Sequence, residues 1–401
     1  MSIESFKICR RKVISTLLEL LPIPGASGDE ERVVSYIREQ LGRMDISDAD
    51  ICVDDAHRRS PLGGNTGNLI VRLAGTAPGA PRMFVSHLDT VPGCLGTVPL
   101  LGDKMICSGK STTGLGADNR TGVAVLLNTI REIVENSIPH PPLTFAFTVQ
   151  EERGQLGARH IDLELLGAPE LSFNFDGGRP AKLTIGSIGA DRLDIEVTGI
   201  SSHAGLHPEK GASAVVAAGK AIADLHDRGL LGAISYRNTR LTTNIGIVAG
   251  GTAVNVVPER VMLKAEVRGQ DRELRASLAN VFKSAFEEAA VAVRNVDKQA
   301  ARSDTRFRTD YEAFLLADSE PCVLEAERAI RWAGLTPFRA VANGGTDANW
   351  LFIHGIPTVS LGAGQVAAHS LEEGVNIEEY EKACLIALRL ATVTSKKGVD
   401  I

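Results

Sequence analysis

Four short apolar segments of the chain run straight into polar residues. Each is bounded by proline or glycine and is too short for a helix, so we predict a β-strand at each one. The four segments are Met83–Asp89, Leu143–Glu152, Leu171–Asp176 and Thr358–Gly362. Helical patterns fall between some of them, at Thr121–Asn136 and Glu378–Thr392. Strands that alternate with helices predict an α/β fold, with a mixed, mostly parallel sheet flanked by helices.

The middle of the chain has a different order of elements. From Leu193 to Tyr311 the pattern predicts a strand, a helix, two strands, a long helix and a last strand. This β-α-β-β-α-β order is typical of a small ferredoxin-like α+β sandwich. Because the α/β pattern then resumes, we predict that residues 191–316 form a domain inserted into a larger one, which comprises residues 1–190 and 317–401. The expected elements are Leu193–Val197, Ala212–Asp227, Leu241–Val248, Arg260–Val267, Asp271–Val293 and Thr305–Tyr311.

Composition narrows the class of protein. The 401 residues are 44% hydrophobic and 23% charged, with a formal net charge of −6, which is typical of a globular protein of two domains. We find no basic stripe and no apolar run long enough to span a bilayer, so we expect neither a nucleic acid nor a membrane as partner. The six cysteines are scattered and form no C-x-x-C pair, which favours reduced thiols in a cytoplasmic protein.

Two of the predicted strands end in candidate metal-binding residues. His87 and Asp89 are two positions apart, so both point to one side of a strand, and the carboxylate is placed to orient the imidazole of a metal-bound histidine. Glu151 and Glu152 directly follow another strand, and adjacent carboxylates repel each other unless a cation compensates them. The alternative in both cases is a solvated group on the surface.

Asp118, Asp176 and His369 are further candidates. Asp118 follows Gly114–Ala117 and precedes a helical pattern, so it suits both a helix N-cap and a ligand that the glycines bring close. Asp176 and His369 follow strands, where a turn residue is the alternative. Ligands of open α/β sheets bind outside the carboxyl ends of the strands. Two histidines and four carboxylates suit zinc but are too many for one four-coordinate ion, so we predict two metals that share a carboxylate.

These motifs occur in an order that resembles a known family. The chain is similar to the dinuclear zinc exopeptidases that include peptidase T, carboxypeptidase G and the aminoacylases, and most similar to the peptidase T-like proteins. The resemblance covers nearly the whole chain, from roughly residue 10 to residue 395. The matching segments are His87–Gly93, Gly116–Asn119, Glu151–Glu152, Asp176–Gly178, Ser202–Gly205, Gly344–Asp347 and His369.

The resemblance implies a metal-binding role for five residues. His87 and Asp176 would bind one zinc ion, and Glu152 and His369 would bind the other. Asp118 would bridge both ions and would precede a cis peptide bond. Cobalt or manganese could replace zinc in such a mixed set of ligands.

The resemblance also implies how the reaction proceeds. Asp89 would orient His87, and Glu151 would be the general base that takes a proton from water. The inserted domain would be the lid and dimerisation domain, so we expect a homodimer. His203 in this domain would stabilise the oxyanion of the partner's reaction, and His207, four residues later, is the alternative.

Four further residues match positions that bind substrate in the family. They are Asn255, Arg268, Gly345 and Thr346. The planar guanidinium of Arg268 suits a substrate carboxylate, although an exposed strand arginine is the alternative. Gly345 and Thr346 would line the same pocket, although a tight turn alone would also explain them.

The implied activity is metal-dependent hydrolysis of an amide bond in a short peptide. The alternatives are an amidohydrolase that deacylates N-acyl or N-carbamoyl amino acids and, from a different class, a non-catalytic scaffold with the same fold. Two departures from the family matter. Asn119 stands where the family often has a second aspartate, and the loop before His369 lacks the tyrosine and basic residues of true peptidase T, which leaves tripeptide specificity open.

Overall fold

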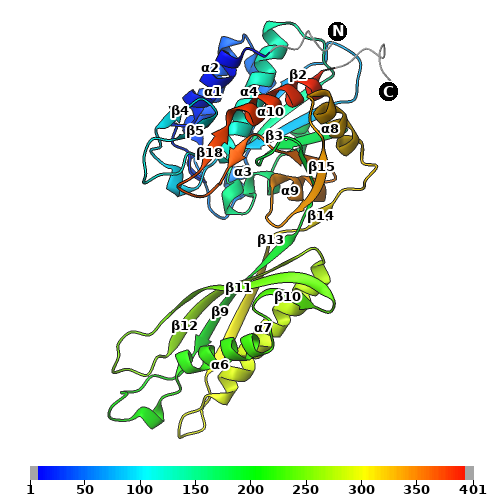
Figure 1. Cartoon of the computed structure of the whole chain (residues 1–401). Helices are drawn as coiled ribbons and strands as arrows, with labels where there is room; N and C mark the ends of the chain where they lie inside the picture. Colours follow the sequence, from blue (N-terminus) through cyan, green and yellow to red (C-terminus); the bar gives the residue numbers. More distant parts are fainter. Residues whose placement is uncertain (1–7, 393–401) are drawn as a thin grey trace. The chain divides into compact units, whose positions relative to one another are not determined.

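The structure is a computed structural model that describes residues 8–392. The chain forms two compact units, each of which is layered from helices and a sheet (Figure 1). The first unit comprises the residues up to Ser187 and from Leu315 onward, and the second comprises Ile188–Phe314. The first unit ends at Ser187, three residues before the expected end at residue 190. It resumes at Leu315, two residues before the expected residue 317.

A nine-stranded mixed sheet forms the centre of the first unit. Its four middle strands lie in the order β6-β3-β7-β16 and are parallel, whereas β2 and β8 flank them in the antiparallel direction. The predicted α/β fold with a mixed sheet is therefore confirmed. The strands are β1 (Ile51–Val53), β2 (Leu69–Leu73), β3 (Arg82–His87), β6 (Leu143–Thr148), β7 (Leu171–Phe175), β8 (Lys182–Ser187), β14 (Phe314–Leu315), β15 (Phe338–Ala342) and β16 (Thr358–Leu361).

Helices cover both faces of this sheet because its middle strands are apolar on both sides. Phe84 of β3 stacks on Phe145 with ring centroids 5.3 Å apart, whereas its neighbours Met83 and Val85 pack with Leu351 of α9 on the other face. Helix α4 contacts β3, α1 and α10. The helices of this unit are α1 (Arg10–Leu20), α2 (Glu31–Arg43), α3 (Ala56–Arg59), α4 (Ala117–Glu135), α5 (Leu156–Arg159), α8 (Pro321–Trp332), α9 (Asp347–Ile353) and α10 (Ile377–Ala391).

A small four-stranded sheet, which the sequence pattern did not predict, lies in the same unit. Its order is β17-β18-β5-β4, so it joins the segment after β3 to the segment after β16. The loop between β17 and β18 carries His369. The strands are β4 (Pro99–Leu101), β5 (Met105–Ser108), β17 (Gln365–Val366) and β18 (Gly374–Asn376).

The second unit is an antiparallel five-stranded sheet in the order β10-β11-β12-β9-β13. Alternate residues of its strands, such as Leu193 and Ile195, are buried against α6 and α7 (Figure 1). The predicted order of elements is present, and β10 adds a hairpin that we did not predict. The elements are β9 (Gly189–Thr198), α6 (Ala214–Asp227), β10 (Gly232–Tyr236), β11 (Thr239–Gly250), β12 (Arg260–Gly269), α7 (Arg272–Ala292) and β13 (Arg302–Tyr311). Within residues 8–392, no helix has the length and apolar character needed to cross a membrane.

Candidate active site

The carboxyl ends of β6, β3 and β7 lie side by side, and the predicted ligands gather there. His87 is the last residue of β3, and Asp176 directly follows β7. Glu152 belongs to a 3-10 turn after β6, and Asp118 lies in the first turn of α4. His369 reaches the same place from the loop between β17 and β18. Five segments that are far apart in the sequence therefore supply one cluster.

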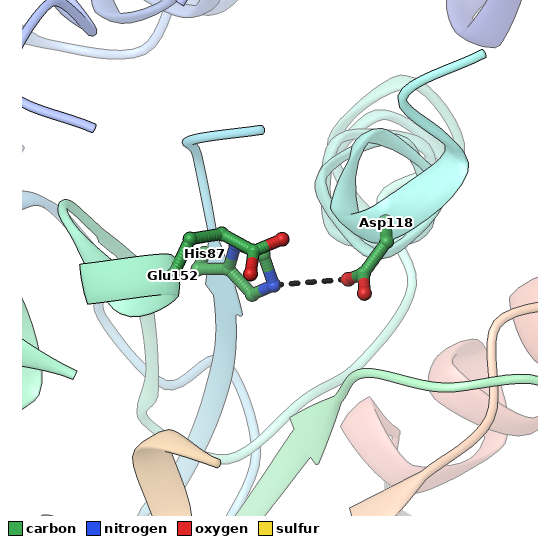
Figure 2. A group of neighbouring side chains, drawn as sticks. All are labelled: His87, Asp118 and Glu152. Carbon is green, nitrogen blue, oxygen red and sulfur yellow. Dashed lines mark hydrogen bonds and ion pairs between the residues drawn. The ribbon is translucent and has the colours of Figure 1, made fainter. Parts of the chain in front are cut away.

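The five side chains contact one another directly. Nε2 of His87 lies 3.1 Å from Oδ1 of Asp118 and 3.9 Å from Oδ1 of Asp176. Nε2 of His369 lies 2.8 Å from Oε1 of Glu152 and 3.4 Å from Oδ2 of Asp118. Figure 2 shows His87 on its strand facing Asp118 on the helix, with Glu152 beside them, and one ligand atom from each of the three lies within 4.8 Å of the others. Asp118 thus contacts one histidine with each of its carboxylate oxygens.

His87 is held between two carboxylates. Its Nδ1 lies 3.1 Å from the backbone oxygen of Asp89 and 3.4 Å from Oδ1 of the same residue, while its Nε2 faces Asp118. Burial lowers the pKa of His87, but hydrogen bonds to Asp118 and Asp89 raise it well above its ordinary value. Nε2 faces the carboxylates where a metal ion would bind, and Asp89 makes the contact with Nδ1 that an orienting role requires.

The carboxylates of the cluster repel one another, and burial together with this repulsion raises the pKa of Asp176 and of Glu152. Burial and the charge of Asp118 raise the pKa of Asp176 to about 7, and burial raises the pKa of Glu152. Hydrogen bonds to Asp118 and Glu152 raise the pKa of His369 to about 10. The contacts with His87 and His369 offset part of this repulsion. Three carboxylates and two imidazoles around one point are a donor set that suits divalent cations such as zinc.

Glu151 lies beside this cluster in a different setting. Its side chain is buried, and burial raises its pKa well above the ordinary value, while the charge of His87 lowers it. The backbone N–H groups of Glu151 and Glu152 donate to Oδ1 and Oδ2 of Asp89 at 2.9 and 3.1 Å. One carboxylate therefore holds both His87 and the turn that carries Glu151.

Two family signatures match the chain: the peptidase dimerisation domain at residues 185–294 and peptidase family M28 at residues 68–189. The uncharacterised protein YqjE of Bacillus subtilis is 30% identical over 387 residues, which cover 96% of this chain and 99% of that protein. The aminopeptidase PepT of Bacillus cereus is also 30% identical, and its structure matches with a TM-score of 0.81 over 96% of this chain and 98% of that one. The chain belongs to the peptidase T-like family.

Further peptidase T-like proteins are similar to this chain in sequence and in structure. A tripeptidase of Staphylococcus aureus is 27% identical and matches with a TM-score of 0.85 over 96% of this chain and 98% of that one. Peptidase T of Salmonella enteritidis is 28% identical over 313 residues, which are 75% of this chain and 70% of that protein. An amidase of the hydantoinase/carbamoylase family from Burkholderia multivorans shares the fold, with 17% identity and a TM-score of 0.63. These matches confirm the family that we predicted from the motifs. They also confirm the prediction that the protein is a metallopeptidase.

The hydrogen bonds of Asn119 explain why an amide stands where the family often has a second aspartate. The peptide bond between Asp118 and Asn119 is cis, as the resemblance implies. The buried side chain of Asn119 donates from Nδ2 to Oγ of Ser86 at 3.1 Å and to the backbone oxygen of Phe175 at 2.8 Å. Its Oδ1 accepts a hydrogen bond from Nε2 of Gln365 at 2.8 Å. An aspartate could not donate to these acceptors, so the amide suits this position.

Glu373 is a buried carboxylate of the site that the sequence analysis did not identify. Its Oε2 accepts hydrogen bonds from the N–H groups of Leu115 and Gly116 at 2.9 and 2.6 Å, and its Oε1 accepts one from the N–H of Asp118 at 3.0 Å. Glu373 therefore fixes the loop that presents Asp118. The available signal was a pair of acidic residues shortly after His369.

The loop before α9 lies near the cluster. Thr346 directly precedes the helix, and its N–H donates to Oδ1 of Asn349 at 2.8 Å, so it acts as a helix cap. The next residue, Asp347, is buried and accepts a hydrogen bond from Oγ1 of Thr148 at the end of β6. Gly345 is half-buried just before them. A substrate-binding role for Gly345 and Thr346 stays a prediction.

His203 and Asn255 are close together in the second unit. Both are exposed, and the segments that carry them pair, because the N–H of Ala204 donates to the backbone oxygen of Asn255 at 2.9 Å. Nδ1 of His203 accepts hydrogen bonds from the N–H groups of Gly205 and Leu206, both at 3.1 Å. Because Nδ1 is an acceptor, the proton of the neutral ring is on Nε2, which makes His203 a hydrogen-bond donor toward solvent.

The guanidinium of Arg268 is already engaged within the second unit. Nε and Nη2 donate to the two carboxylate oxygens of Glu266, both at 3.0 Å, and Nη1 donates to Oη of Tyr311 at 3.1 Å. Arg192 also donates to Glu266. Glu266 thus occupies the bidentate face that we expected to hold a substrate carboxylate, and a substrate would have to compete for it.

Proposed function

We propose that this protein is an exopeptidase that hydrolyses an amide bond of short peptides with two zinc ions. The observation that carries the proposal is the contact between five side chains at the carboxyl ends of parallel strands. His87 and Asp176 would hold one ion, Glu152 and His369 would hold the other, and Asp118 would hold both. The two oxygens of Asp118 face the two histidines, which supports the bridging role.

When bound, the metal pair would polarise the scissile carbonyl group and lower the pKa of a water molecule. Glu151 would take a proton from the attacking water and would later give it to the leaving amine. Two features of the structure support this role. Asp89 accepts a hydrogen bond from the backbone N–H of Glu151, and burial raises the pKa of the Glu151 carboxyl group above its ordinary value, which makes the carboxylate a stronger base.

We further propose a homodimer that forms through the second unit, where the peptidase dimerisation domain matches. His203 of one copy would donate its Nε2 proton to the developing oxyanion in the other copy. The exposed position of His203 and its acceptor bonds at Nδ1 support this donor role. The scattered cysteines support a cytoplasmic location.

Replacing His203 by alanine should lower kcat by about 10²- to 10³-fold, because one oxyanion donor is lost. The metal content should stay unchanged, since His203 belongs to another unit than the ligands. Steady-state kinetics and elemental analysis of the purified variant measure both quantities. His207→Ala is the matched control, because it removes a nearby exposed histidine that lies 3.4 Å from Glu209. If kcat falls in the His207 variant and not in the His203 variant, His207 is the oxyanion donor in place of His203.

Metal affinity should fall as the pH is lowered from 9 to 6. Protonated His369, with its pKa raised to about 10, must release a proton to bind a metal, and below pH 7 Asp176 must release one as well. The apparent Kd for zinc should therefore rise by at least about tenfold per pH unit, and more steeply below pH 7. Competition titration with a chromophoric chelator measures this dependence. Affinity that is independent of pH would contradict the assigned ligands.

A substrate panel tests the proposed activity. Tripeptides, N-acetyl amino acids and N-carbamoyl amino acids are offered to the zinc-loaded protein, and we expect turnover of the tripeptides. The peptidase T and tripeptidase relatives support this expectation. Turnover of acylated amino acids alone would favour an amidohydrolase. No turnover of any class, with two metals bound, would favour the non-catalytic scaffold.

A further inference from the structure

The turn that carries Glu151 has a backbone conformation that needs support. Gln150 and Gln155 have φ values of 55° and 51°, which lie in the left-handed region. For residues other than glycine, this conformation is disfavoured by the contact between Cβ and the backbone. The position of Glu151 and Glu152 therefore depends on the contacts that hold this turn.

Three consecutive N–H groups of the turn point at two buried carboxylates. The N–H of Gln150 donates to Oε1 of Glu30 at 2.9 Å, and the next two N–H groups donate to Asp89. Oε1 of Glu30 also accepts a hydrogen bond from the N–H of Gly28 at 2.9 Å. Oε2 of Glu30 is buried without a hydrogen-bond partner among residues 8–392. A single oxygen of Glu30 thus ties the first residue of the turn to the loop before α2.

The loop from Ala26 to Glu30 supports both carboxylates. Oγ of Ser27 donates to Oδ2 of Asp89 at 2.6 Å, and the backbone oxygen of Glu30 accepts from Val33 and Val34 at the start of α2. The backbone of Glu30 is therefore held at the start of α2, and its side chain extends from there to the N–H of Gln150. Replacing its acceptor oxygen would release Gln150 without touching a metal ligand.

Buried Arg120 balances the charge behind the turn. Burial lowers the pKa of its guanidinium to about 10, while the charges of Asp89 and Glu30 act to raise it. Its Nη2 donates to the backbone oxygen of Ile23 at 3.1 Å, just before the loop. The buried guanidinium of Arg120 therefore offsets part of the negative charge of the two carboxylates that hold the turn.

We propose that Glu30 is a positioning residue for the catalytic turn: its carboxylate holds the N–H of Gln150 and thereby places Glu151 and Glu152. The inference rests on the proposed function only in that it takes Glu151 as the general base. It assigns a role to a loop that none of the matched motifs includes.

The test compares Glu30→Gln with Glu30→Met. Glutamine keeps an acceptor oxygen that can bind the N–H groups of Gly28 and Gln150, whereas methionine fills the same space without an acceptor. Leu17→Ala is the control for stability, because Leu17 is buried in α1, a helix that carries neither the turn nor the carboxylates that hold it. For each zinc-loaded protein we measure kcat, KM, metal content and hydrogen exchange of the amides at residues 150–152.

Glu30→Met should lower kcat by about 10- to 100-fold, with KM changed by less than about threefold and two metals retained. Its amides at residues 150–152 should exchange faster than in the wild type. Glu30→Gln should restore kcat to within about fivefold of the wild type and restore slow exchange. Leu17→Ala should lower Tm with kcat unchanged.

The inference is overturned if the methionine variant keeps the wild-type kcat and slow exchange, or if glutamine is as damaging as methionine. If the methionine variant does not fold, Glu30→Asp replaces it, because its shorter side chain keeps the charge but cannot reach Gln150. Wild-type exchange and kcat in that variant would likewise overturn the inference. If the wild-type protein hydrolyses no peptide, the proposed function fails, while the exchange data still decide whether Glu30 holds the turn.

Discussion

Replacing Glu151 by glutamine should lower kcat by about 10³-fold while two metal ions stay bound. The substitution preserves the shape of the side chain and removes only its ability to carry a proton. The backbone N–H of residue 151 still donates to Asp89, so the turn stays in place. Metal analysis and steady-state kinetics on the same preparation separate the loss of chemistry from the loss of metal.

The neighbouring substitution Glu152→Gln is the matched control. Oε1 of Glu152 lies 2.8 Å from Nε2 of His369 within the cluster, so this variant should bind metal more weakly. Excess zinc should restore part of its activity, whereas excess zinc should not restore Glu151→Gln. A fully active Glu151→Gln variant would show that another group carries the proton.

Replacing Asp118 by alanine should abolish metal binding and lower kcat/KM by at least about 10³-fold. This carboxylate is the one that contacts both histidines, so its loss disturbs both proposed ion sites at once. Without it, His87 and His369 each lose one of the two carboxylate hydrogen bonds that raise their pKa values. Elemental analysis should find no bound metal above background, and activity should stay low when zinc is added.

Wild-type protein stripped by a chelator is the control for this variant. It should lose its activity and regain it when zinc or cobalt is added, because all five ligands are still present. An Asp118→Ala variant that keeps two metals and wild-type turnover would exclude Asp118 as the bridging ligand. Stripped wild-type protein that stays active would exclude metal-dependent catalysis altogether.

The cluster was predictable because its members mark the ends of strands. Strands β3, β6 and β7 are short, apolar and bounded by glycine or proline, and parallel strands end at a common edge. Applied to the predicted parallel sheet, that rule brings His87, Glu152 and Asp176 together without knowledge of the strand order. His369 was harder to place, because the small sheet that presents it pairs β18 with β5, and no local pattern records such a distant pairing.

The residues that hold the site in place were not predictable in the same way. Glu30 and Glu373 act through side-chain bonds to backbone N–H groups that are 120 and 255–258 positions away in the sequence. Each looks like an ordinary acidic residue near a helix or turn. Arg268 differs, because Glu266 two positions earlier on the same strand was a visible partner that the prediction did not weigh. Strand β10 was not predicted because it is short and mostly exposed, so its alternation of apolar and polar residues is weak.

Anomalous X-ray diffraction from crystals of the zinc-loaded protein tests the dinuclear centre most directly. Two peaks should appear, one in contact with His87 and Asp176 and one in contact with Glu152 and His369, each within about 2.0–2.2 Å of an oxygen of Asp118. A single peak, or peaks away from these five side chains, would contradict the account.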